Sequence, residues 1–450
     1  MLVLPRLLRV LLGGVVLAGI LLLVVAGLRR SAPQSAAAPA GGAAIQRSAR
    51  EPLAMILTPH EGEGELDKKI RALQTKIAES SHRSGLLENL GWAFVAKARL
   101  SSDPGFYTLA ERTAKAMQAE NAADPAAALL QGHVYHAMHR FAEAEQIARG
   151  LITGREFVFD YALLGDALME QGKLGEAVEA YQKMVDLKPS LQTYSRVAHM
   201  RWLKGDLPGA LNAAGLAARA GSPREAEAAA WAYARLASYQ MQAGDKAAAR
   251  ASIDGALELA PLYAPALLAR GKLLLGDGNA QEAAALLQRA AEINPLPEYL
   301  WTAAEALRAS GNEDAAQSLE RKLTTTGAAT DARTFAVFLA TRGQTPDIAL
   351  RLADEELKSR QDVFSYDAMA WAQFSAGQLE AARENMRRAL AEGTKDARLF
   401  FHASAIAAAS GDHPEALKFL NEARGLEHML LPSERSALQQ QLTAFVQRQP

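Results

Sequence analysis

Three histidines spaced three residues apart form the one cluster in this sequence with the character of a metal site. They are His133, His136 and His139. Residues three apart are neighbours on a helix, so His133 and His136 could share a metal ion. His139 lies where that helix should end, and no carboxylate or cysteine has an evident matching position. The alternative is that the histidines pack in a groove, so we expect any zinc or nickel binding to be weak.

Motifs for nucleotide binding or hydrolysis are missing from the sequence. The glycine-rich stretch 276–278 lacks the Gly-Lys-Ser/Thr that completes a phosphate-binding loop. Neither Gly-x-Ser-x-Gly nor His-Glu-x-x-His occurs. With no cysteine, disulfides, thiolate ligands and a cysteine nucleophile are excluded. We therefore expect no enzyme activity and no bound cofactor.

The charge balance also excludes a class of partner. The chain has 49 basic and 50 acidic residues and a net charge of −1. Nucleic-acid-binding proteins usually carry a basic face or stripe, which this composition does not suggest. We expect no nucleic-acid partner.

A pattern with a period of about 34 residues organises most of the chain. A small residue marks the middle of a first helix at Gly91, Gly132, Gly165, Ala198, Ala237, Gly271, Ala304, Ala336, Ala370 and Ser404. A turn glycine follows seven residues later at Gly172, Gly205, Gly244, Gly278, Gly311, Gly343, Gly377 and Gly411. Glycine suits a helix C-terminus because it adopts positive φ without a steric cost. The pattern predicts about ten helical hairpins.

The clearest copy of the pattern resembles the tetratricopeptide repeat. It reads Tyr161-x2-Leu164-Gly165-x2-Leu168, then Gly172, Ala177-x3-Tyr181-x2-Met184 and Pro189. That family signature implies helical hairpins that stack into an all-α solenoid, because no hairpin can bury its apolar face alone. The resemblance covers roughly residues 65–428. Within the family, the chain most resembles bacterial membrane-tethered members.

Several repeats depart from the signature. Extra residues appear at 99–107 and at 220–224, and they predict longer loops that either carry specificity or are merely tolerated. In repeats seven and eight, residues 324–327 replace the closing proline, and Ala349 comes one residue late. We expect these two repeats to be weak.

A second stripe on the first helices is predicted to line a concave groove. It lies at −6, −3, +1, +4 and +5 from each marker and includes all five tryptophans of the chain. The predicted protein- or peptide-binding residues are Trp92, His133, His136, Met169, His199, Trp202, Trp231, Met241, Trp301, Arg308, Trp371 and Phe374. Tryptophan is enriched at binding hot spots, although these rings could instead fill space between successive helices.

The groove charges argue against one known ligand mode. Capture of a C-terminal carboxylate needs several cations converging on one place. The groove cations are Lys272, Arg308, Arg333 and Arg398, and they are partly countered by Glu298, Glu305 and Asp367. An apolar, aromatic ligand face fits this groove better.

The N-terminus lies outside the repeat array. Residues 7–28 carry one charge, Arg9, and the 19 residues from Val10 to Leu28 carry none, which is enough to span a bilayer as a helix. This stretch is longer than the apolar region of a usual signal peptide, so we expect an uncleaved anchor, with later cleavage as the alternative. Flanking arginines leave the orientation nearly balanced. We expect a single-pass protein of the bacterial cytoplasmic membrane, with the array on the periplasmic side.

The expected organisation has four parts. They are an anchor at 1–30, a flexible Ala/Pro/Gly linker at 31–64, a solenoid at 65–428 with a capping helix at 65–80, and a polar C-terminal capping helix at 429–450. The expected function is that of a membrane-tethered scaffold that binds a protein or peptide in its groove and assembles an envelope complex. The rival is a metal- or cofactor-handling accessory protein that uses His133 and His136. The oligomeric state cannot be read from the sequence.

Overall fold

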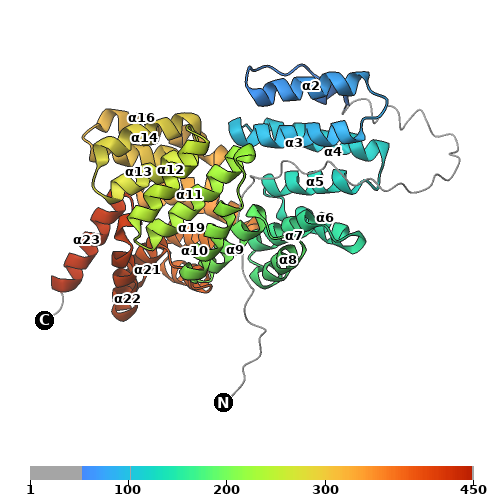
Figure 1. The fold of residues 1–450 in the computed structure, drawn as a ribbon. Coiled ribbons are helices and arrows are strands. Elements are labelled where there is room, and N and C mark those ends of the chain that lie inside the picture. The colour runs from blue at the N-terminus through green and yellow to red at the C-terminus, as the bar shows by residue number, and fades with distance from the viewer. Residues whose placement is uncertain (1–52, 102, 448–450) are drawn as a thin grey trace, which may run out of the picture. The chain divides into compact units, whose positions relative to one another are not determined.

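The computed structural model describes residues 53–101 and 103–447 (Figure 1). The predicted anchor at 7–28 lies outside these ranges, as does most of the predicted linker. No helix among the described residues is both long and apolar enough to cross a membrane.

Within the described ranges the chain is all-α. It contains ten pairs of consecutive helices, and the first helix of each pair holds one of the ten markers. The first five pairs are α3 (Ser84–Ser101) with α4 (Gly105–Glu120), α5 (Pro125–Ala137) with α6 (Phe141–Gly154), α7 (Val158–Glu170) with α8 (Leu174–Leu187), α9 (Leu191–Leu203) with α10 (Leu207–Arg219), and α11 (Ala226–Gln242) with α12 (Lys246–Leu259). The last five are α13 (Ala264–Gly276) with α14 (Ala280–Ile293), α15 (Pro297–Ala309) with α16 (Glu313–Thr330), α17 (Ala332–Thr341) with α18 (Pro346–Ser359), α19 (Val363–Ser375) with α20 (Leu379–Leu390), and α21 (Ala397–Ala409) with α22 (His413–Gly425). The predicted helical solenoid is confirmed.

The described residues divide into two compact units. The N-terminal unit comprises residues 53–167 and the C-terminal unit residues 168–447, so the boundary falls inside α7. Each unit is treated separately below.

Close approach of neighbouring helices explains the small marker residues. A Cβ atom on Gly91 would lie 2.3 Å from Leu130 of the next first helix, and one on Gly132 would lie 2.5 Å from Leu163. Both separations are far below van der Waals contact. A larger side chain would therefore force the stacked hairpins apart.

From the second repeat on, the turn seven residues after the marker has a left-handed backbone. The glycines there have positive φ, for example +72° at Gly172 and +75° at Gly205. In the second repeat this position is His139, whose φ is 59°. His139 therefore ends α5, as predicted, and its ring stacks on Phe141 at 5.5 Å.

The repeats that depart from the signature are still helical. Helix α16 runs without a break through residues 324–327, where the hydroxyl of Thr324 donates to the Glu320 carbonyl at 2.8 Å. A Cβ on Gly327 would lie 2.7 Å from Phe335, so glycine lets α17 pack closely after this helix. The insertion at 220–224 forms a short 3₁₀ turn, η1 (Pro223–Glu225), capped by Ser222.

The predicted linker is too long at its C-terminal end. Residues 53–64 lie against α2 (Glu65–Glu79), and Ile56 is fully buried. The side-chain amide of Gln74 donates to the carbonyls of Ile56 at 2.9 Å and Thr58 at 2.8 Å. Hydrogen bonds from Lys97 and His60 lower the pKa of Asp67 to about 2, so this carboxylate ties the same segment to α2 and α3.

Candidate functional site

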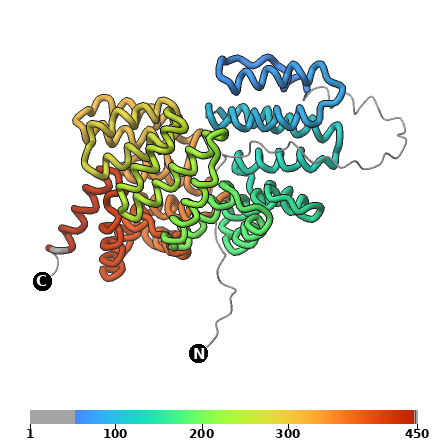
Figure 2. The backbone as a smooth tube through the Cα atoms, in the orientation of Figure 1, coloured from blue at the N-terminus to red at the C-terminus, as the bar shows by residue number. Residues whose placement is uncertain are grey.

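The C-terminal unit closes on itself, because its last helices return to its first ones (Figure 2). The Gln361 N–H donates to the Glu170 carbonyl at 2.9 Å, at the end of α7. One repeat further along, the Thr394 hydroxyl donates to the Leu203 carbonyl at 2.6 Å, at the end of α9. Gln242, at the end of α11, donates to the carbonyl of Lys395, which follows Thr394 in the same loop. We call this line of contacts the seam.

Salt bridges and ring stacking strengthen the seam. Arg360 contacts Glu170 at 2.5 Å, and Lys204 pairs with Glu392. The ring of Trp202 stacks on that of Phe364, with centroids 5.6 Å apart and planes 16° from parallel. Trp202 therefore packs across the seam and remains partly exposed.

Two turn glycines also permit the seam. A Cβ on Gly172 would lie 2.4 Å from the Gln361 carbonyl oxygen, and one on Gly205 would lie 2.5 Å from that of Gly393. The equivalent glycines Gly244 and Gly311 have open space around that position. Positions 172 and 205 thus need glycine for backbone approach as well as for their positive φ.

The chain's own C-terminal segment, residues 427–441, covers part of one face of the first helices in this unit. We call that face the inner face; it is made by the predicted groove stripe of α11, α13, α15 and α21. The segment consists of η2 (Glu427–Met429) and the start of α23 (Pro432–Gln447). His428 contacts the Met241 carbonyl at 2.7 Å, and Arg435 donates to the Leu275 carbonyl at 3.4 Å. The predicted polar cap is therefore exposed mainly beyond Leu438, which is itself fully buried.

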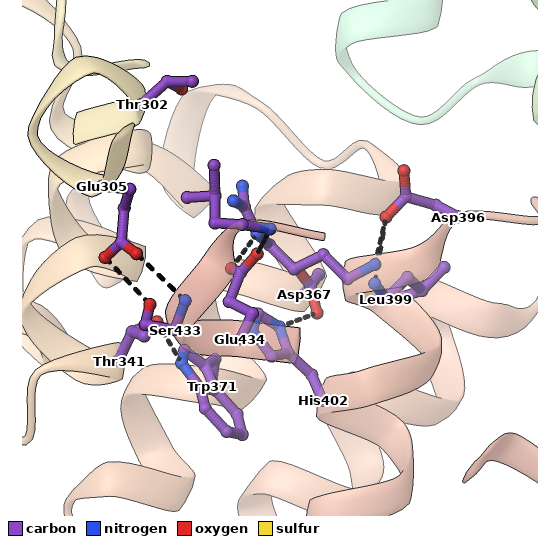
Figure 3. Close-up of polar contacts among 12 residues, drawn as sticks. Thr302, Glu305, Thr341, Asp367, Trp371, Asp396, Leu399, His402, Ser433 and Glu434 are labelled. Atoms are coloured by element: carbon purple, nitrogen blue, oxygen red, sulfur yellow. Dashed lines mark hydrogen bonds and ion pairs between the residues drawn. The ribbon is translucent and has the colours of Figure 1, made fainter. Parts of the chain in front are cut away.

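Two carboxylates make the most specific contacts of this segment (Figure 3). Glu305 accepts hydrogen bonds from the Ser433 N–H at 3.0 Å and from the Ser433 hydroxyl at 2.9 Å. Glu434 accepts one from Arg398 at 2.6 Å, while its other oxygen caps the helix by accepting from the Leu431 N–H. Both carboxylates are at most 2% exposed.

The tryptophans of α15 and α19 are packed inside the C-terminal unit. Trp301 is 1% exposed and lies beside Phe338 and the Arg398 guanidinium, whose central carbon is 4.7 Å from the ring centroid. The ring of Trp371 stacks on His402 at 3.9 Å, and its indole N–H donates to Thr341 at 2.9 Å. His402 in turn contacts Asp367 at 2.8 Å (Figure 3). These contacts favour packing over an open anchor role.

A small recess brings two more predicted residues together. His199 of α9 and Trp231 of α11 line it with Arg235 and Tyr239. Arg235 donates to the Tyr239 hydroxyl at 3.0 Å and lies 3.4 Å from the His199 ring nitrogen. Burial and the Arg235 cation lower the pKa of His199 well below its ordinary value, so this imidazole is neutral at pH 7.

The other predicted residues of the C-terminal unit are dispersed. Met169 and Met241 are buried, and Met241 belongs to an apolar cluster against which Met429 of the C-terminal segment packs. Phe374 stacks on Trp371 and is partly exposed. Arg308 pairs with Glu313 and Glu320, away from the C-terminal segment.

Cations of the predicted groove stripe are matched by acids. Lys272 pairs with Glu298 at 2.5 Å, and Arg333 pairs with Asp362 at 2.9 Å. The positive charge of Lys272, with smaller effects of Arg398 and Arg235, lowers the pKa of Glu298. Neighbouring carboxylates therefore compensate both of these cations. The Glu298 side chain is 50% exposed and offers an accessible position on the inner face.

In the N-terminal unit, three predicted residues lie on α3 and α5. Trp92 is 8% exposed, and its ring centroid is 5.2 Å from that of His133. His136 is 6% exposed and packs edge-on against Phe141 at 5.3 Å. Among the described residues, no three His, Cys, Asp or Glu side chains gather as a metal-binding group.

Sequence reasoning missed the residues that complete these sites. Arg235 and Tyr239 lie at −2 and +2 from their marker, outside the predicted stripe. Ser433 and Glu434 lie in a helix that was expected to be a cap. The only sequence signal for this contact was a Ser-Glu pair at the start of that helix, after two leucines. The partner of Ser433, Glu305, is 128 residues away in the sequence.

Comparison with known proteins supports the repeat assignment. Family profiles described as tetratricopeptide repeat match residues 161–191, 234–296 and 368–426. No curated protein matches the sequence.

Three solved structures show limited similarity. The crystal structure of MamA protein shares 21% identity, covering 38% of this chain and 91% of that one, with a TM-score of 0.30. The human IFIT1 dimer with PPP-AAAA shares 16%, covering 59% and 67%, with a TM-score of 0.36. The APC/C hetero-tetramer Cut9-Hcn1 shares 13%, covering 84% and 89%, with a TM-score of 0.32. The ten helical pairs on the predicted register and the three matched stretches together support a tetratricopeptide-like repeat solenoid.

Proposed function

We propose that this protein is a non-enzymatic scaffold, tethered to the bacterial cytoplasmic membrane, that binds a segment of a partner protein on the inner face of its C-terminal unit. Tetratricopeptide repeat proteins generally mediate protein–protein interactions and are typically not catalytic. The partner is a protein of an envelope complex, and the array lies on the periplasmic side.

One observation carries this proposal: the inner face already holds a helical segment through side-chain hydrogen bonds. Glu305 and Arg398 contact Ser433 and Glu434, and the contacts include both donors of Ser433. A surface that recognises one short helix by directed contacts has the chemistry needed to recognise another.

Photo-crosslinking can test the binding face. A crosslinking amino acid at position 298 should capture one segment of one partner, because the Glu298 side chain is half exposed on the inner face. The matched control is position 282, where Glu282 of α14 is exposed on a second helix. A synthetic peptide of the captured segment should then bind the purified chain. Equal capture from both positions, or a peptide that does not bind, would contradict the proposal.

The membrane tether rests on the uncharged stretch Val10–Leu28. We expect the full chain to stay with membranes after alkaline washing, and a chain that starts at Ala44 to be released. Orientation is tested by protease protection in spheroplasts, where an exported array is digested. A mature N-terminus beyond Leu28, found by sequencing, would show that the anchor is removed.

A further inference from the structure

We infer that the C-terminal segment, residues 427–441, is a built-in competitor for the inner face, which a partner segment of the same chemistry displaces. This inference rests on the proposed function and adds both its regulation and the kind of ligand. The ligand class is a helix N-terminus with a hydroxyl residue followed by an acid, preceded by two apolar residues.

The recognised chemistry is read from the contacts. Glu305 accepts two hydrogen bonds from Ser433, one from the backbone and one from the hydroxyl. Only a residue at the first turn of a helix offers a free backbone N–H in that position, and only Ser or Thr adds the hydroxyl. Arg398 then selects the acid that follows, here Glu434. Leu430 and Leu431, at 3% and 4% exposure, supply the apolar part.

The charged contacts give specificity rather than a large net affinity. Burying Glu305, Glu434 and part of Arg398 removes them from water, and this desolvation offsets much of the attraction between them. The carboxylates of Glu434, Asp396 and Glu298 outweigh the effect of burial and raise the pKa of Arg398, so the cation remains charged. The segment is held further by its buried leucines, by the packing of Met429 and by the hydrogen bonds of His428 and Arg435. Residues 439, 440, 443 and 444 of α23 are exposed and add little.

Covalent linkage to the rest of the chain explains why the C-terminal segment stays bound although its net affinity is modest. A short tether gives the segment an effective concentration on the order of millimolar at its own site. The connection runs through Gly425, which is exposed and has open space around it. Cutting the chain there removes the linkage and leaves each contact in place.

The test cuts the full-length chain after folding. A protease recognition sequence is inserted after Gly425, and the probe is a fluorescent synthetic peptide of residues 426–447. We expect the cut chain to exchange its own fragment for the peptide, with an affinity at least about ten-fold above that of the uncut chain. Retention of the original fragment with no uptake of peptide would overturn the inference, since the segment would then be a permanent part of the fold.

Matched variants test the recognised chemistry. A peptide with Ser433→Ala and Glu434→Gln should bind the cut chain at least about ten-fold more weakly, because Glu305 loses the hydroxyl donor and Arg398 loses its carboxylate partner. A peptide with Gln440→Ala should bind normally, since Gln440 is exposed. In the chain, Glu305→Gln should weaken binding while Glu282→Gln leaves it unchanged. Equal binding by all these variants would overturn the assigned ligand class.

The partner segment found by crosslinking separates the two proposals. It should bind the cut chain more tightly than the uncut chain. Equal affinity for both forms would contradict the inference that the C-terminal segment competes, but it would leave the proposed scaffold function intact. Absence of binding to either form would contradict the proposed scaffold function itself.

Discussion

Trp301 shows what a side chain on the inner face contributes. Its ring is 1% exposed, between Phe338 and Arg398. Truncating such a side chain leaves a cavity, so Trp301→Ala should lower the free energy of unfolding by about 3–5 kcal/mol. Trp202→Ala should cost less, because Trp202 is partly exposed. Urea unfolding followed by circular dichroism measures both.

The replacement Trp301→Phe is the matched control. No hydrogen-bond partner for the Trp301 indole N–H is found among the described residues. Phenylalanine therefore keeps most of the apolar contact and loses no hydrogen bond, so it should cost clearly less than alanine. If Trp301→Ala unfolded at the same urea concentration as the unchanged chain, the ring would not be part of the core.

The positions of these residues were predictable, but their surroundings were not. The repeat register places Trp202, Trp301 and Trp371 on one stripe of the first helices. What covers that stripe comes from residues far along the chain, as Ser433 does for Glu305. No local pattern carries that information, so a binding role for the predicted tryptophans remains a prediction.

At the scale of elements, a turn glycine can be required for two reasons: a positive φ and the close approach of another backbone segment. Gly205 and Gly311 both have positive φ, of +75° and +84°. Only Gly205 faces a backbone carbonyl, that of Gly393, where a Cβ would lie at 2.5 Å. Gly311→Ala should cost about 1–2 kcal/mol for the left-handed backbone. Gly205→Ala should cost more, because it also pushes the seam apart.

Thermal melts of the two glycine variants, with tryptophan fluorescence as a second signal, measure this difference. The Gly205→Ala variant should also change the emission of Trp202, which stacks on Phe364 across the seam. Equal melting temperatures and unchanged emission in both variants would show that the seam imposes no demand at Gly205.

The helices themselves follow from local chemistry. The left-handed turn at His139 and the small residue at Gly132 both follow from the register. The continuity of α16 does not follow from the register, because its threonines stand where the repeat signature has a closing proline. Their hydroxyls donate to carbonyls four residues earlier, and Gly327 leaves room for Phe335. Both features are compatible with a helix and are invisible to a consensus signature.

At the scale of the whole molecule, the repeat signature predicts contacts between neighbours only. The seam adds contacts between repeats far apart in the C-terminal unit. It depends on the curvature of the stacked hairpins, which accumulates over several repeats and is not encoded in any one of them. The C-terminal segment covers part of the inner face of this closed unit, so full access to that face requires the segment to move.

Hydrogen exchange at the Gln361 amide tests this closure most directly. Gln361 is an exposed residue, and its N–H donates across the seam to the Glu170 carbonyl at 2.9 Å. A closed seam protects this amide, so it should exchange far more slowly than the same amide in a free peptide. It should lose that protection in Gly205→Ala and keep it in Gly311→Ala. Exchange at the free-peptide rate in the unchanged chain would contradict a closed C-terminal unit.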